Sequence, residues 1–200
     1  MLLEAKNIHF AYPKSQQLFS GANLGVDAGE RVALIGPSGS GKSTLAQIIA
    51  GYIAPQSGEV LFDESPLPRT GFCPVQLIYQ HPEQALNPRW KLGDSLHEAW
   101  SPSESFLNEI GISPEWLDRY PTELSGGELQ RFAVARALAP GTRVVIADEI
   151  TTMLDVISQA QIWRLILDQV QQRKLGLIAV THNLELAKHI STRIIKIEDL

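Results

Sequence analysis

One nine-residue segment constrains the fold of this chain more than any other feature. Residues 36–44 read G-P-S-G-S-G-K-S-T, which matches the phosphate-binding pattern G-x-x-x-x-G-K-[ST]. A short apolar run, 31–35, comes directly before the segment, and apolar residues recur three and four positions apart over 42–51 after it. These patterns predict a buried strand, a glycine-rich turn and a helix. The alternative is a strand-to-helix turn whose glycines serve geometry alone.

The residue types of this segment suit phosphate binding. Glycines let backbone N–H groups turn toward an anion, and the following helix presents its positive end to the same point. Lys42 is expected to reach the β and γ phosphates of a nucleotide, and Ser43 is expected to hold Mg²⁺. The predicted loop consists of Gly36, Pro37, Ser38, Gly39, Ser40, Gly41, Lys42, Ser43 and Thr44.

Two carboxylates follow a second apolar run. Residues 144–147 read V-V-I-A and are followed by Asp148 and Glu149. Doubly wound sheets bind their ligands at such strand ends. We expect Asp148 to hold Mg²⁺ through water and Glu149 to polarise the attacking water as the general base. The alternative interpretation is that acidic residues follow the strand only because turns are solvated.

Two further polar residues follow apolar runs. His182 comes after 178–181, and we expect its imidazole to contact a γ-phosphate. Gln80 comes after 77–79, and we expect it to complete the Mg²⁺ shell and to position water. Taken alone, a histidine at a strand end is more often a satisfied core or turn residue, and a lone glutamine carries little specificity.

A second anion site is predicted near the middle of the chain. Residues 124–131 read L-S-G-G-E-L-Q-R and combine a serine and two glycines with a helix predicted to begin at Glu128. Free N–H groups at a helix N-terminus bind anions. Because one chain does not need two γ-phosphate sites, Ser125, Gly126 and Gly127 are expected to serve a nucleotide held by another subunit. The alternative is a simple helix cap formed by Ser125.

Composition and charge describe one globular domain. The chain has 200 residues, of which 44% are hydrophobic, and a formal net charge of −5, which disfavours broad contact with nucleic-acid phosphates. No window has the roughly 18 uninterrupted apolar residues of a membrane span, and the first residues lack the pattern of a secretory signal. A single cysteine, Cys73, cannot form an intramolecular disulfide and fits the reducing cytoplasm.

Strand and helix patterns alternate along the chain. Strands are predicted over 3–10, through Val26, and over 31–35, 144–147 and 177–180, and a helical insertion is predicted from about Pro82 to Leu124. Such alternation predicts an α/β fold with helices packed on a parallel sheet. The predicted helices cover 42–51, 96–100, 105–110, 115–120 and 157–172.

The order of these motifs resembles the nucleotide-binding subunit of ATP-binding cassette (ABC) transporters, and the resemblance covers nearly all of the chain. The segment LSGGE-x-Q-R is specific to this class among P-loop proteins, and a small nucleotide kinase would leave it without a role. In the family's terms, 36–44 is the Walker A loop, 124–130 the signature, and Asp148 with Glu149 the end of the Walker B strand. Gln80 matches the Q-loop, Asp155 the D-loop, His182 the switch histidine and Tyr12 the aromatic residue that stacks on adenine.

This resemblance implies a fold and a set of partners. It implies a P-loop NTPase (RecA-like) parallel-sheet core with an N-terminal antiparallel β part and a helical insertion. The single domain 1–200 would have its core in 1–81 and 131–200 and a helical subdomain over about 82–130. The resemblance further implies ATP and Mg²⁺ as ligands, a head-to-tail dimer with a second ABC ATPase subunit, identical or different, and two transmembrane permease subunits. An extracytoplasmic solute-binding protein would act indirectly, the chain would be peripheral at the cytoplasmic face of the cell (inner) membrane, and no nucleic acid is expected.

Within the family, three short segments look like the dipeptide, oligopeptide and nickel import branch. They are L-N-P-R at 86–89, R-Y-P at 119–121, and L-D-V at 154–156 with Q-A-Q at 159–161. An ABC efflux ATPase and a soluble, non-transport ABC ATPase are the alternatives. The chain departs from the family pattern where Ile150 replaces proline, Thr152 and Met153 replace serine and alanine, and Asn183 replaces aspartate.

Overall fold

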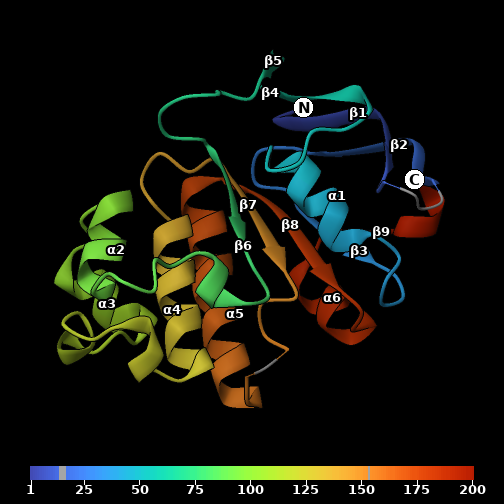
Figure 1. Ribbon diagram of the computed structural model, residues 1–200. Coiled ribbons are helices and arrows are strands. Elements are labelled where there is room, and N and C mark those ends of the chain that lie inside the picture. The colour runs from blue at the N-terminus through green and yellow to red at the C-terminus, as the bar shows by residue number, and fades with distance from the viewer. Residues whose placement is uncertain (14–16, 153) are drawn as a thin grey trace.

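The chain has two β-sheets and a set of helices, which the computed structural model describes for residues 1–13, 17–152 and 154–200 (Figure 1). The larger sheet is parallel throughout and has the strand order β6-β7-β8-β3-β9. Its strands are β3 (Arg31–Ile35), β6 (Val75–Ile78), β7 (Val144–Asp148), β8 (Gly176–Thr181) and β9 (Arg193–Lys196). Every residue of β7 and β8 is buried, as in the centre of a parallel sheet that is covered on both faces.

The smaller sheet is antiparallel and has the strand order β2-β1-β4-β5. Its strands are β1 (Leu3–Ala11), β2 (Gln17–Val26), β4 (Ser57–Phe62) and β5 (Ser65–Pro66). In β1 the residues Leu3, Ala5, Ile8 and Phe10 are buried, and the register shifts where Asn7 has φ 49°. The sheet lies beside α1 at the top of Figure 1, and its buried side faces the parallel sheet across that helix.

Helices cover both faces of the parallel sheet, and the sheet separates two hydrophobic cores. Val144 and Ile146 of β7 enter the core shared with α1 and the antiparallel sheet, whereas Val145 and Ala147 enter the core built from the helices on the opposite face. In Figure 1, α2 and α3 lie beyond α4, on the side away from α1. The helices are α1 (Lys42–Ile49), α2 (Leu92–Ala99), α3 (Glu104–Ile110), α4 (Gly126–Ala137), α5 (Val156–Arg173) and α6 (Leu184–Ile190).

The segment predicted as a helix over 115–120 is instead a turn, and this prediction was wrong. Only a 3₁₀ turn, Pro114–Trp116, forms there. The carbonyl groups of Leu117 and Arg119 accept hydrogen bonds from the N–H groups of Gly93 and Leu92 at 2.8 and 2.9 Å, so they cap the start of α2 instead of continuing a helix. Further 3₁₀ turns cover Pro82–Gln84, Pro121–Glu123 and Ile197–Asp199.

Two other helix boundaries differ from the sequence-based expectation. The helix of the signature segment begins at Gly126 and not at Glu128, because Ser125 takes the N-cap position and Glu128 becomes the third helical residue. α2 begins earlier than the predicted 96–100 and ends at Ala99, because Trp100 is extended. Among the described residues, none of the helices has both the length and the apolar composition that crossing a bilayer requires.

Candidate active site

The glycine-rich segment 36–44 connects the carboxyl end of β3 with the start of α1. Gly39 and Gly41 have φ values of 78° and 95°, a left-handed backbone that glycine adopts without strain. Gly41 is the N-cap of α1, and a Cβ atom there would lie 2.9 Å from Cζ of Phe19. The turn therefore requires glycine at this point both for its backbone and for its close packing.

Lys42 is the first residue of α1, and its side chain is folded back into the loop. Only 4% of Lys42 is exposed, and its Nζ donates to the carbonyl oxygens of Gly36 and Pro37 at 2.9 and 2.8 Å. The same Nζ lies 3.9 Å from Oε1 of Glu149. The lysine charge is thus fixed inside the loop, where a phosphate group would meet it.

Ser43 and Asp148 meet across the gap between α1 and β7. Ser43 Oγ donates to Asp148 Oδ1 at 3.1 Å. Burial raises the pKa of Asp148, the hydrogen bond from Ser43 opposes that rise, and the neighbouring Glu149 adds to it. A hydroxyl and a carboxylate oxygen are hard ligands of the kind that Mg²⁺ uses together with substrate phosphates. The pair fits a shared metal–phosphate site, and no cluster of three or more acidic, histidine or cysteine residues that would cage an ion exists in the described part of the chain.

Glu149 begins the turn after β7 and is held from several sides. Its φ of 48° lies in the left-handed region, and its N–H donates to the carbonyl oxygen of Val180 in β8 at 3.0 Å. Its carboxylate Oε2 lies 3.2 Å from Nδ1 of His182, at the end of β8. The carboxylate is 14% exposed, which leaves it access to a water molecule beside Lys42.

An open pocket of about 610 Å³ joins Lys42, Ser43 and Glu149, and it takes in Gln80, which follows β6. Asp148 and His182 do not line this pocket but contact Ser43 and Glu149, which do. Gln80 Nε2 donates to Oγ1 of Thr152 at 3.4 Å. Thr152 carries no motif signal of its own, and the sequence shows only that it replaces the family's serine. The pocket is lined by Tyr12, Gln17, Leu18, Ser38, Gly39, Gly41, Lys42, Ser43, Thr44, Gln80 and Glu149.

Tyr12 lies at the rim of this pocket and is 46% exposed. Its hydroxyl lies 3.0 Å from Oγ1 of Thr44, and its ring packs edge to face on Phe10 with centroids 5.0 Å apart. The structure therefore places the predicted adenine-stacking residue at the pocket and adds a polar contact with the phosphate-binding loop that the sequence did not indicate.

Seven of the predicted nucleotide-binding residues do not line the pocket. Three of them, Gly36, Pro37 and Ser40, belong to the phosphate-binding loop, and the other four lie outside that loop. Ser125 caps α4, and Glu128 Oε2 accepts hydrogen bonds from its N–H and its Oγ at 2.7 and 2.8 Å. Asp155 caps α5 by accepting from two backbone N–H groups at 3.0 Å each, and a hydrogen bond from Ser158 Oγ holds its pKa low. A Cβ atom on Gly127 would lie 3.1 Å from Leu154, so the signature segment starts beside the D-loop. The four residues are Ser125, Gly126, Gly127 and Asp155.

The departures from the family pattern have local explanations at two positions. Ile150 is 2% exposed and packs in the core behind the turn. Asn183 caps α6 by accepting from the N–H of Leu186 at 3.1 Å, which an aspartate does equally well. Met153, also noted as a departure, lies outside the described residues.

Comparison with known proteins identifies relatives of the whole domain. A family profile described as "ABC transporter" matches residues 19–152. The chain is 38% identical, over 84% of its length, to the probable peptide ABC transporter ATP-binding protein y4tS of Sinorhizobium fredii, and spans 53% of that relative. It is 34% identical to the nickel import system ATP-binding protein NikE of Staphylococcus aureus, over 99% of this chain and 87% of that relative. These names confirm the resemblance to the peptide and nickel branch.

Solved structures of ABC cassettes also resemble this chain. The dimeric structure of a post-hydrolysis state of the ATP-binding cassette MJ0796 bound to ADP and Pi superposes with a TM-score of 0.81 at 26% identity, over 97% of this chain and 93% of that one. A structure of the ATP-binding subunit of an ABC transporter superposes with a TM-score of 0.83 at 25% identity, over 98% of this chain and 85% of that one. With its phosphate-binding loop, paired carboxylates and signature segment, this chain belongs to the ABC transporter family as one of its ATP-hydrolysing cassettes.

Proposed function

We propose that this chain is the ATPase subunit of an importer for peptides or nickel. The observation that carries the proposal is the gathering of Lys42, Ser43, Asp148, Glu149 and His182 at one edge of the parallel sheet. The two curated relatives described above belong to a peptide transporter and to a nickel import system. The proposal includes both peptides and nickel, because the ATPase subunit does not contact the transported solute.

In the proposed reaction the triphosphate lies against the N–H groups of 36–44 and the N-terminus of α1. The Nζ of Lys42 releases the carbonyl oxygens of Gly36 and Pro37 and donates to phosphate oxygens instead. Its positive charge offsets the negative charge that develops in the transition state. Ser43, Gln80 and, through water, Asp148 would hold Mg²⁺, and the ion would supply positive charge that offsets the phosphate charge. Tyr12 stacks on the adenine.

Glu149 acts as the general base of this reaction. It accepts a proton from water while the water oxygen bonds to the γ-phosphorus and the bond to the β-phosphate oxygen breaks. His182 contacts the γ-phosphate, and its 3.2 Å contact with Glu149 keeps the carboxylate turned toward that phosphate.

The second anion site serves a partner subunit. Ser125 and Gly126 are exposed, and neither lines the pocket that holds Lys42. In a head-to-tail dimer, Ser125, Gly126 and Gly127 complete the opposite ATP site, with Asp155 beside them. Dimeric structures of a related cassette support dimerisation. The partner is a different ATPase chain, with a second copy of this chain as the alternative.

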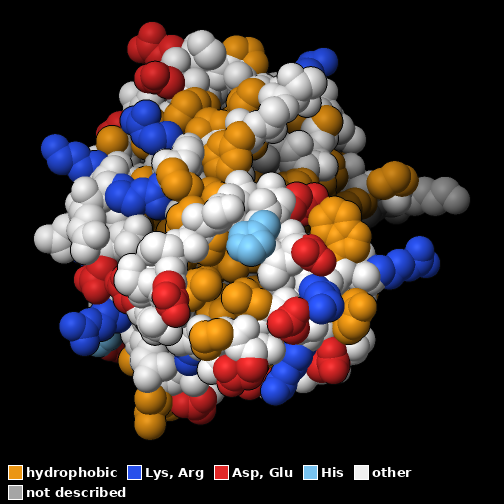
Figure 2. Space-filling model, turned by 90° about the vertical axis from the view of Figure 1, so that its left-hand side faces the viewer, with side chains coloured by type: hydrophobic (Ala, Val, Ile, Leu, Met, Phe, Trp, Pro, Cys, Tyr) orange, Lys and Arg blue, Asp and Glu red, His pale blue; other side chains and the backbone are white. Residues whose placement is uncertain are grey.

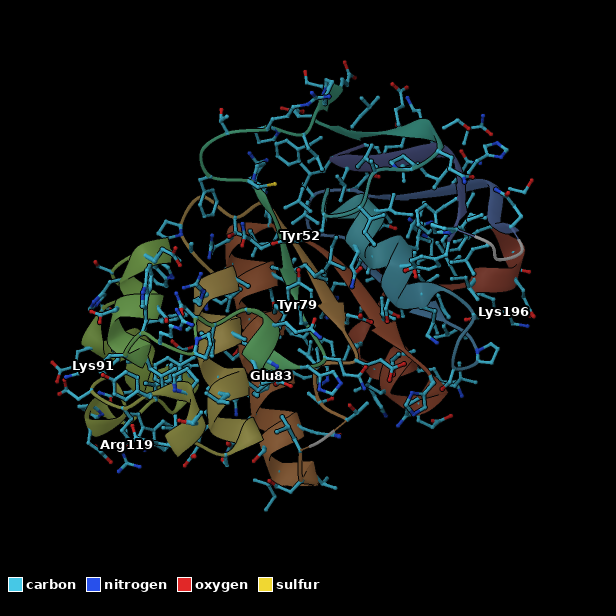
Figure 3. The ribbon with its side chains drawn as sticks, viewed as in Figure 1. Tyr52, Tyr79, Glu83, Lys91, Arg119 and Lys196 are labelled. Carbon is cyan, nitrogen blue, oxygen red and sulfur yellow. The ribbon has the colours of Figure 1, made fainter. Side chains whose placement is uncertain are left out.

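We propose that the helical subdomain, about 82–130, contacts the two transmembrane permease subunits. The face on the side of α2 and α3 exposes hydrophobic side chains among charged ones (Figure 2). Tyr52 and Tyr79 lie close together, with ring centroids 5.8 Å apart, near β6 (Figure 3). Binding to the permease subunits would make the chain a peripheral subunit at the cytoplasmic face of the cell (inner) membrane.

Affinity purification from native membranes tests the proposed assembly. Two membrane proteins and a second ATPase chain should co-purify with the tagged chain. Vesicles that contain the complex, with the solute-binding protein outside and ATP enclosed in the lumen, should accumulate peptide or nickel from outside. Outward transport would instead identify an efflux ATPase. Recovery with ribosomes or DNA and without membrane proteins would identify a non-transport ABC protein.

Two substitutions in the purified complex test the proposed chemistry. Glu149→Gln should keep ATP binding but lose hydrolysis by about 10²-fold or more, because the amide cannot accept the proton. Lys42→Ala should weaken both binding and hydrolysis. Near-normal turnover by the Glu149→Gln complex would contradict the assignment of the general base.

A further inference from the structure

The turn that follows β7 holds Glu149 through its backbone carbonyl group. Thr152 reaches that carbonyl oxygen twice, with its N–H at 3.2 Å and its Oγ1 at 3.1 Å. Glu149 has φ 48°, in a region that favours glycine. Both hydrogen bonds from Thr152 therefore stabilise a backbone conformation that glutamate does not favour by itself.

The hydroxyl of Thr152 also contacts Gln80. A threonine hydroxyl has one hydrogen and two lone pairs. Because Oγ1 gives its hydrogen to the Glu149 carbonyl oxygen, a lone pair remains to accept the hydrogen bond from Gln80 Nε2 at 3.4 Å. One atom thus connects the residue at the end of β6 with the backbone of the residue at the end of β7.

We infer that Thr152 is a positioning residue, which sets the direction of the Glu149 carboxylate according to the position of Gln80. The carbonyl carbon that Thr152 holds is bonded to the Cα atom of Glu149, so a shift of the turn that reorients this Cα atom moves the carboxylate relative to His182 and Lys42, which lie 3.2 and 3.9 Å from it. When Gln80 moves away from Thr152, the hydroxyl keeps its hydrogen bond to the Glu149 carbonyl oxygen but loses its connection to the end of β6. The inference rests on the proposed role of Glu149 as the general base.

The rest of the turn is anchored independently of this hydroxyl. Thr151 is buried, and its carbonyl oxygen accepts from Gln159 Nε2 at 2.6 Å. Thr151 Oγ1 accepts from the indole N–H of Trp163 at 3.2 Å. Removing the Thr152 hydroxyl should therefore leave the turn folded, so that an effect on catalysis can be separated from an effect on folding.

The test compares Thr152→Val, which removes the hydroxyl at nearly constant shape, with Thr152→Ser, which keeps it, in the complex that the chain forms with its partner subunits. Thr152→Val should lower kcat by about 10-fold and leave KM for ATP within about two-fold, since a misdirected base affects the chemical step and not binding. Thr152→Ser should keep at least about half of kcat. Thr70→Val, an exposed threonine in a distant loop, is the matched control and should leave kcat, KM and Tm unchanged.

A double-mutant cycle with Gln80→Ala tests the connection between the two residues. The Thr152→Val effect on kcat should be smaller in the Gln80→Ala background than in the wild type, because the contact is already lost. Equal effects in both backgrounds would overturn the link to Gln80. A wild-type kcat in the Thr152→Val complex would overturn the positioning role. So would a loss of kcat in the Thr152→Ser complex as large as that in the Thr152→Val complex. Near-normal turnover by Glu149→Gln would instead refute the proposed general base, so the two failures are distinguishable.

Discussion

Arg173 offers the clearest test of how the loop between the signature helix and β7 is held. It is the last residue of α5, and its guanidinium donates to four carbonyl oxygens at 2.7–3.1 Å. Three of these distances involve the same nitrogen, so about three good hydrogen bonds form at once. The four acceptors follow the end of α4 and are the carbonyl oxygens of Leu138, Ala139, Pro140 and Thr142.

We expect Arg173→Ala to lower the free energy of unfolding by about 2–4 kcal/mol. Each hydrogen bond from a charged donor contributes about 1.5–3 kcal/mol, but water reaches the exposed Pro140 and replaces part of that sum. The cation also lies at the carboxyl ends of two helices, where their dipoles favour positive charge. Thermal and urea unfolding of the purified chain measure the change, which corresponds to a fall in Tm of about 4–16 °C.

Arg164→Ala is the matched control, because it removes the same residue type from the same helix. Arg164 is 86% exposed, and its contact with Asp168 is 3.9 Å, so a loss of at most about 0.5 kcal/mol is expected. A loss below about 0.5 kcal/mol in Arg173→Ala would refute the argument that this guanidinium holds the loop.

Three further predictions concern other parts of the molecule. Tyr12→Ala should weaken ATP binding several-fold while Tyr12→Phe and Tyr12→Trp should not, because stacking on adenine contributes on the order of 1 kcal/mol; equal affinities by calorimetry would show that Tyr12 is only packing. Ser125→Arg should block hydrolysis at the partner's ATP site but leave nucleotide binding at Lys42. Ser103→Arg, at another exposed helix cap, should leave hydrolysis at the partner's site unchanged. Full activity of a dilute monomeric preparation, unchanged by Ser125→Arg, would exclude a role in trans. Ser95→Ala should raise the free energy of unfolding by up to about 1 kcal/mol, since the buried Oγ of Ser95 has no hydrogen-bond partner among the described residues, and a decrease would show that the hydroxyl is satisfied.

Much of the fold was predictable where the signal is local. The apolar runs of β3, β7 and β8 and the glycine spacing of 36–44 depend on short stretches of sequence, and the structure has these elements where they were expected. The parallel sheet then brings Asp148 to Ser43, 105 positions away in sequence. This contact follows from the topology, which the alternation of strands and helices indicates.

The missed elements have weak local signals. β4 is exposed or half-buried along its whole length, and it forms because it pairs with β1. β9 is a short edge strand with mostly exposed residues, and α6 has only seven residues. Thr152 and Arg173 could not be assigned roles from sequence, because their partners lie 72 and 31–35 positions away and come together only in the folded turns.

The backbone of Glu149 sets a limit on how stable this domain can become. Glutamate in the left-handed region costs about 1 kcal/mol relative to glycine, which has no Cβ atom to clash. A glycine at this position should therefore make the protein harder to unfold, yet it would remove the carboxylate beside Lys42 and His182. Laboratory selection for thermal resistance alone should favour such a loss, whereas growth that depends on solute uptake should oppose it.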